Sequence, residues 1–214
     1  MKPARLWHAV LAGLATAGLA IEFYVTIARD PAAWPHRLLI YFSFFTILTN
    51  ILVAAASLGI AQKRGGLHRW AHRPAPRTAI SVYIAVVAVI YQLLLARLVH
   101  LSPIGWWGNL LVHQIVPAMW LTGWILFGRH GGIAHSAPLH WLAYPAIYVV
   151  WTLAHGAASG WYPYPFMNVA TRGGMTVAIN MLLMTLFFAV LGYAFRWIDT
   201  VLGRRLARIT PKAK

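Results

Sequence analysis

Six separate runs of the sequence are each about 20 residues long and strongly apolar, and this feature limits the fold more than any other. A helix needs about 20 mostly apolar residues to cross the hydrocarbon of a bilayer. Backbone amides and carbonyls find no water there, so each run should be a helix rather than an open strand. We therefore predict an all-α polytopic membrane protein, a single domain over residues 1–214 built as a bundle of six transmembrane helices. The predicted helices cover residues 6–27, 38–60, 79–99, 105–128, 139–158 and 173–197.

The basic residues are spread unevenly over the segments that join these runs, and the formal net charge is +15 at pH 7. Lysine and arginine favour the cytoplasmic side of a membrane, so we expect a multi-pass protein of the cell membrane with both termini in the cytoplasm. Clusters of this kind attract anionic lipid headgroups. Membrane lipids are therefore the expected partners, and nucleic acid is not. Fourteen of the 18 basic residues fall on this side: Lys2, Arg5, Lys63, Arg64, Arg69, Arg73, Arg77, Arg129, Arg196, Arg204, Arg205, Arg208, Lys212 and Lys214.

The chain contains no cysteine, which excludes disulfides, thiolate metal sites and cysteine nucleophiles. His68 and His72 are spaced i,i+4 in the segment 62–78, and such a pair could bind a metal ion on a helix. Two prolines follow and no acid lies near them, so we interpret 62–78 as a basic loop. We expect neither a metal ion nor a cofactor.

Glu22 is one of only three acidic residues in the chain, and it lies inside the first apolar run. Insertion scales put the cost of a carboxylate at the centre of a membrane helix at about 2.5–3.5 kcal/mol. A partner, water or a bound proton must therefore reduce this cost. Arg97 is the expected counter-ion, and His113 and His155 are the expected hydrogen-bond partners.

The six predicted helices all place polar side chains in the half of the membrane nearer the outer side, whereas their inner halves are mainly apolar. Interhelical hydrogen bonds explain some of these residues, but ionisable groups inside a membrane usually mark a functional site. Pro117 also removes a donor from the helix and frees the carbonyl of His113. We predict a polar cavity at this level. Its candidate residues are Glu22, Ser43, Thr46, Asn50, Tyr91, Gln92, Asn109, His113, Thr152, His155, Thr176 and Asn180.

A hydroxyl group beside a histidine is the minimum for nucleophilic acyl transfer, because the imidazole removes the hydroxyl proton. Amides from Asn50 or Asn109 are candidates to stabilise an oxyanion. The segment from Trp161 to Phe166 contains two prolines and four aromatic residues. Proline restricts the backbone, so this segment is predicted to form a stiff lid over the outer mouth of the bundle, with Tyr164 near the substrate.

Three stretches resemble the androgen-induced-gene family of six-helix membrane proteins. They are the helix segment from Tyr41 to Asn50, the segment from Asn109 to Pro117, and His155 followed by the sequence from Gly160 to Phe166. Animal members of this family are intramembrane hydrolases that cleave fatty acid esters of hydroxy fatty acids with a threonine on one helix and a histidine on another. The resemblance covers most of the chain and therefore implies a fatty-acid ester, or another lipid ester, as substrate.

The resemblance selects His113 as the general base and leaves two candidate nucleophiles. Aligning the Phe-Thr pair selects Thr46, whereas aligning the amide further along the helix selects Ser43. We prefer Thr46, because its depth is closer to that of His113. Glu22, Asn50, Asn109, His155 and Tyr164 are then predicted to line the substrate cavity. The alternative prediction is a non-catalytic membrane protein, either a small-solute or proton transporter or a lipid-binding scaffold.

Overall fold

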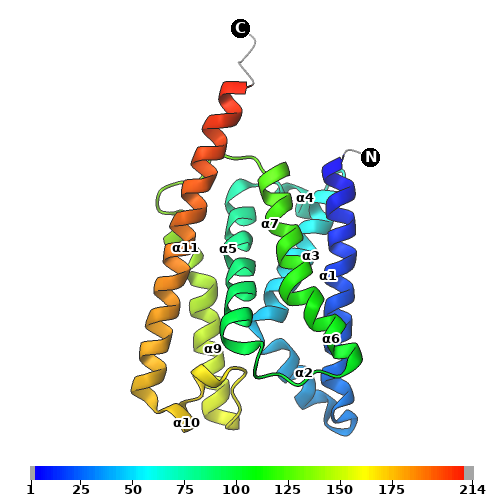
Figure 1. The fold of residues 1–214 in the computed structure, drawn as a ribbon, viewed down its shortest axis with the longest axis vertical. Helices are drawn as coiled ribbons and strands as arrows, with labels where there is room; N and C mark the ends of the chain where they lie inside the picture. Colours follow the sequence, from blue (N-terminus) through cyan, green and yellow to red (C-terminus); the bar gives the residue numbers. More distant parts are fainter. Residues whose placement is uncertain (1–2, 210–214) are drawn as a thin grey trace.

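The computed structural model describes residues 3–209, and within this range every regular element is a helix (Figure 1). Lys2, Lys212 and Lys214, which were counted among the basic residues of one side, lie outside the described residues. Two π-helices, η2 (Tyr91–Leu95) and η3 (Leu111–Ile115), and two 3-10 helices, η1 (Pro31–Ala33) and η4 (Pro165–Met167), interrupt or join the α-helices. The α-helices are α1 (Pro3–Ala28), α2 (Trp34–Phe42), α3 (Phe45–Ala61), α4 (Gly66–Ala71), α5 (Pro74–Ile90), α6 (Pro103–Leu110), α7 (Val116–Phe127), α8 (Ala137–Trp141), α9 (Ala143–Ser159), α10 (Val169–Arg172) and α11 (Gly174–Ile209).

Four helical segments within the described residues are long and apolar enough to cross a membrane: Pro3–Ala28, Pro74–Leu95, Pro103–Phe127 and Gly174–Arg208. The pair α2 and α3 makes a fifth if it counts as one bent span. Large apolar side chains on the outside support a lipid environment, because Leu93, Ile147 and Leu182 are 73%, 70% and 69% exposed. The chain is therefore a helical, membrane-embedded protein. The predicted helix 139–158 is divided between α8 and α9, and α9 alone has 17 residues.

The second predicted helix, residues 38–60, is not continuous. The chain breaks at Ser43 and Phe44, and the two parts meet at an angle of 73°. This break places Ser43 between the helices and Thr46 in the first turn of α3. The expected loop at 62–78 is also wrong, because this segment contains all of α4 and the beginning of α5.

The helices α1, α3, α5 and α7 surround the main apolar core, and α9 and α11 lie along one side of it (Figure 1). We call the end of the bundle that carries α2 and α10 the α2 end, and the opposite end the α4 end. The first residue of α1 and the last residue of α11 both lie at the α4 end.

The α4 end is less apolar inside than the sequence indicated. His8 is fully buried, and neither of its ring nitrogens has a hydrogen-bond partner among the described residues. Arg77 is 4% exposed and donates from Nη1 to the carbonyl of Phe127 at 3.1 Å. Ser81 is buried beside it and accepts a hydrogen bond from Trp120. Polar side chains are therefore buried at this end of the bundle as well as at the α2 end.

Candidate functional site

Two π-helices face each other near the α2 end and position the aromatic part of the site. The amide of Ala96 donates to the carbonyl of Tyr91 at 2.8 Å in η2, and that of Val116 donates to Leu111 in η3. A π-turn changes the direction of the side chains within a helix, and such turns often occur at functional sites. Here they bring the rings of Tyr91 and His113 into a stack, with centroids 3.8 Å apart and planes 21° apart.

Thr46 and His113 form a hydroxyl–imidazole pair between α3 and η3. Thr46 Oγ1 lies 3.3 Å from His113 Nε2. The other ring nitrogen, Nδ1, lies 3.1 Å from the backbone carbonyl of Asn109, which can only accept. Nδ1 therefore carries the proton, and the lone pair of Nε2 faces the Thr46 hydroxyl. The pair has the arrangement that a general base and its nucleophile require.

Asn50 holds this pair together from one turn further along α3. Its Nδ2 donates to the carbonyl of Thr46 at 2.9 Å and to that of Val112 at 3.1 Å. An α-helical partner for the Val112 carbonyl would be the amide of Val116, which bonds to Leu111 instead. A π-helical partner would be the amide of Pro117, which has no hydrogen. Asn50 thus supplies the donor that η3 lacks.

Asn109 also uses its amide for a structural hydrogen bond. Its Nδ2 donates to the hydroxyl of Tyr91 at 2.7 Å, and its own backbone carbonyl orients His113. Both donors of Asn50 face backbone carbonyls. The expectation that Asn50 or Asn109 stabilises an oxyanion is therefore not supported by the geometry, which makes them positioning residues.

Ser43 and His155 form a second hydroxyl–imidazole pair, separate from the first. Ser43 Oγ lies 2.8 Å from the carbonyl of Leu39 and 3.4 Å from His155 Nδ1. The carbonyl of Ser43 accepts from the hydroxyl of Tyr148 at 2.9 Å. Ser43 is fully buried and is absent from the lining of both cavities described below. These bonds fix the bend between α2 and α3, and Thr46 is better placed than Ser43 to act as a nucleophile.

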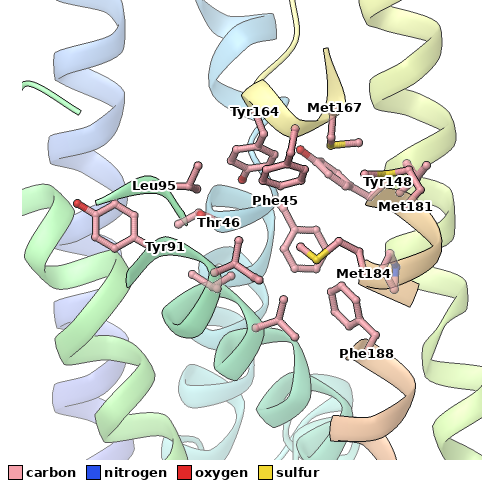
Figure 2. A pocket seen from close by; sticks show the side chains of 16 residues that line it. Phe45, Thr46, Tyr91, Leu95, Tyr148, Tyr164, Met167, Met181, Met184 and Phe188 are labelled. Carbon is pink, nitrogen blue, oxygen red and sulfur yellow. The ribbon is translucent and has the colours of Figure 1, made fainter. Parts of the chain in front are cut away.

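Two cavities meet at Thr46. The larger has a volume of about 520 Å³ and opens between α1, α2, η2, η3 and the segment after α9. The smaller has a volume of about 60 Å³ and is bordered by apolar side chains such as Met181, Met184 and Phe188 (Figure 2). Four residues border both cavities: Thr46, Tyr91, Leu95 and Tyr164. The hydroxyl–imidazole pair thus lies between a wide, partly polar space and a narrow apolar one.

The segment from Trp161 to Pro165, which we predicted to be a lid, borders the larger cavity. Gly156 leaves room for Tyr162, since a Cβ at position 156 would lie 2.0 Å from the tyrosine ring. Asn180 Nδ2 donates to the carbonyl of Phe166 at 2.8 Å and ties the segment to α11. These contacts keep the lid in a defined position.

Tyr164 reaches from this lid to the beginning of α3 (Figure 2). Its phenol faces the side chain and backbone amide of Thr46 and the amide of Phe45. Amides in the first turn of a helix have no helical acceptor, and no side chain caps α3. Burial raises the pKa of Tyr164 above its usual value of 10.0, so the phenol keeps its proton and can donate it in a hydrogen bond.

Glu22 borders the larger cavity and is half-buried. It lies against α6, where a Cβ at Gly108 would be 2.7 Å from Oε1. No hydrogen bond or ion pair that the structure shows within residues 3–209 includes its carboxyl group. Arg97 is exposed and does not border the cavity, so the predicted counter-ion is wrong. The cations that share the cavity with Glu22 are Arg29 and Arg37.

The sequence did not indicate the part that three residues play here: Tyr91, which stacks on His113, and the cavity-lining Arg29 and Arg37. The depth estimate predicted that Tyr91 lies at the level of His113. It did not predict that the Tyr91 ring stacks on the imidazole. Within the described residues, no three His, Asp or Glu side chains come close enough to bind one metal ion.

Comparison of the chain with protein-family models, with curated proteins and with solved structures finds no match. The chemistry of the site is therefore argued from its geometry.

Proposed function

We propose that this protein is an integral membrane hydrolase of lipid esters, with Thr46 as nucleophile and His113 as general base. The observation that carries the proposal is the direction of the imidazole. Its Nδ1 is held by the Asn109 carbonyl, so its Nε2 lone pair faces the Thr46 hydroxyl at 3.3 Å. The pair lies where two cavities of different polarity meet. A chain of a reacting ester would lie in the larger cavity, with the smaller apolar cavity on the other side of the pair.

The reaction would proceed by acyl transfer and hydrolysis. His113 Nε2 takes the proton of the Thr46 hydroxyl as Oγ1 attacks the ester carbonyl carbon. The tetrahedral intermediate then breaks its bond to the alcohol, and the alcohol oxygen receives the proton from His113. Water, activated by the same imidazole, attacks the acyl–threonine ester and releases the acid. The net reaction is ester plus water to acid plus alcohol.

The oxyanion of this intermediate would form at the beginning of α3. The backbone amides of Phe45 and Thr46 contact the phenol of Tyr164 there, so we propose that the oxyanion displaces the phenol oxygen as their acceptor and itself accepts from the phenol. Donors fixed before the reaction stabilise developing charge without a cost of reorganisation, and the positive end of the α3 dipole adds to this effect. Tyr164 thus replaces Asn50 and Asn109 as the side-chain donor.

The membrane arrangement belongs to the same proposal. Counting α2–α3 and α8–α9 as one span each gives six spans, and both ends of the described chain then lie on one side. The distribution of Lys and Arg supports a cytoplasmic position for the α4 end in the cell membrane. We further propose membership of the androgen-induced-gene family, which the residues around Thr46 and His113 resemble.

Hydrolysis by the purified protein tests the function. Full-length chain in a neutral detergent should hydrolyse a long-chain chromogenic ester, and Thr46→Ala and His113→Ala should each reduce the rate by at least about a hundredfold. Thr16→Ala is the matched control, because the Thr16 hydroxyl bonds only to its own helix at the Ala12 carbonyl. Equal rates in Thr46→Ala and Thr16→Ala would refute the assignment of the nucleophile.

A non-catalytic transporter is the second candidate function, and one observation favours it. His8 and Arg77 are buried at the α4 end with ring and guanidinium nitrogens that have no partner among the described residues. Unpaired ionisable groups inside a membrane are typical of ion and proton pathways. Proton or solute flux in proteoliposomes that His8→Phe abolishes, without any ester cleavage, would favour this function over the hydrolase.

A further inference from the structure

Three cationic or imidazole side chains from three different segments border one part of the larger cavity, which we call its mouth. Arg29 follows α1, Arg37 lies on α2 and His100 follows η2. All three border the cavity, together with the apolar residues Val25, Leu98 and Leu101 and others. The mouth therefore combines positive charge with apolar surface.

No ion pair within residues 3–209 joins these side chains to a carboxylate, although Arg29 and Glu22 attract each other across the cavity. Arg37 Nε is buried and has no hydrogen-bond partner within residues 3–209. Asp30 is close in sequence, but its Oδ1 accepts from the amide of Ala33 and it does not border the cavity. A buried guanidinium nitrogen without a partner is costly, so an anion that reaches it gains the full value of a charge-assisted hydrogen bond.

Glu22 does not occupy this position. It lies on α1 seven residues before Arg29, which corresponds to about 10 Å along the helix axis. Its neighbour there is Gly108 on α6, one residue before Asn109. Gly18, one turn earlier on α1, packs against Leu111 and Val112, so Glu22 lies about one turn nearer the mouth than His113, between the Thr46–His113 pair and the cations.

We propose that the mouth of the cavity is a binding subsite for the anionic head of an amphiphile, a carboxylate or a phosphate monoester, held by Arg29, Arg37 and His100. The guanidinium groups bind the anion, and the apolar residues next to them contact the beginning of the chain. The chain then extends toward Thr46. The subsite deepens the proposed hydrolase function and rests on it only in treating the amphiphile as a substrate.

Binding of paired amphiphiles tests the subsite without turnover. Full-length Thr46→Ala protein in neutral detergent, at mildly alkaline pH, is titrated with radiolabelled oleate, oleyl alcohol and monododecyl phosphate in a scintillation proximity assay. Oleate should bind about tenfold more tightly than oleyl alcohol, the difference expected for one charge-assisted hydrogen bond. Arg37→Gln should remove this preference, and Arg29→Gln should reduce it. Arg172→Gln is the matched control, because Arg172 is exposed on α10 and does not border the cavity.

The outcomes separate the two anions and the two proposals. Preference for oleate alone assigns a carboxylate, preference for dodecyl phosphate alone assigns a phosphate, and preference for both assigns a general anion subsite. Equal binding of oleate and oleyl alcohol, with no gain for dodecyl phosphate, overturns the subsite, as does an equal loss in Arg172→Gln. A variant that still binds oleyl alcohol is folded. If Arg37→Gln no longer binds oleyl alcohol, the preference for oleate is measured in Arg29→Gln instead. A protein that shows the preference but cleaves no ester refutes the hydrolase and leaves the subsite intact.

Discussion

Replacing Asn50 by leucine and by aspartate tests the hydrogen bonds that hold Thr46 beside His113. Asn50 is fully buried, its Nδ2 donates to the carbonyls of Thr46 and Val112, and its Oδ1 has no partner among the described residues. Leucine has a similar size and no polar atom. Aspartate has nearly the same shape but replaces the two donors by an acceptor.

The expected change in the free energy of unfolding is small for the leucine variant and large for the aspartate variant. An interhelical hydrogen bond in a membrane protein contributes about 0.6–1.7 kcal/mol, and a buried polar group without a partner costs about 1–3 kcal/mol. Leucine loses the bond to Val112 but also removes the unpaired Oδ1, so the free energy of unfolding should change by less than about 1 kcal/mol. Aspartate loses the bond and adds an unpaired acceptor, so it should lose about 2–5 kcal/mol.

Unfolding by dodecyl sulfate in mixed micelles, followed by tryptophan fluorescence, measures both values. Ester hydrolysis should fall in both variants, because neither ties α3 to η3. Pro117→Ala in the Asn50→Leu background restores an amide donor at the π-helical position for Val112, and it should raise the stability without recovering the activity, because it does not tie α3 to η3. Wild-type stability of Asn50→Asp would refute the account of the Val112 carbonyl, and so would an equal loss in both variants.

Three further changes test the lid, its tyrosine and the α4 end. Gly156→Ala places a Cβ 2.0 Å from the ring of Tyr162, so it should displace the lid and cost about 1–3 kcal/mol; Gly13→Ala, with nothing within 4 Å, should not lower the melting temperature. Burial raises the pKa of Tyr164 above 10.0, so the folded state holds this proton more tightly than the unfolded state, and stability should fall as pH rises above about 10. Tyr164→Phe should make this fall in stability less steep in an unfolding titration, and an unchanged slope would contradict the assignment. Asp199 is fully buried, and its carboxylate accepts hydrogen bonds from His130 and the amide of Gly131 in the segment after α7. Asp199→Asn should therefore lower the free energy of unfolding by about 1–3 kcal/mol and expose that segment to protease. Wild-type resistance to protease would show that the contact is not needed.

Four of the six predicted runs are continuous helices long and apolar enough to cross a bilayer, which imposes both length and composition on a span. Depth along a helix also follows from its rise per residue, and it placed Thr46 and His113 at one level. Depth does not give the direction of a side chain. Gln92 is therefore exposed although its depth is that of the site.

The break between α2 and α3 could not be predicted, because no proline or glycine lies near Ser43. Its cause is tertiary: the Ser43 carbonyl accepts from Tyr148, and Phe45 packs against Tyr144, Tyr148 and Phe188. The π-helix η3 had a signal in Pro117, whereas η2 had none. The Val112 carbonyl needs a donor only because η3 is a π-helix, and the sequence did not indicate that Asn50 is this donor. We therefore predicted an oxyanion role for Asn50, whereas the structure shows a structural hydrogen bond.

Covalent labelling tests the central claim most directly. The full-length protein in detergent is treated with a long-chain alkyl fluorophosphonate, which reacts with activated hydroxyl groups, and the adduct is located by peptide mass spectrometry. The geometry of the Thr46–His113 pair predicts a single adduct on Thr46, absent in Thr46→Ala and formed at least about a hundredfold more slowly in His113→Ala. An adduct on Ser43, or labelling of Thr46 at an unchanged rate without His113, would contradict the account.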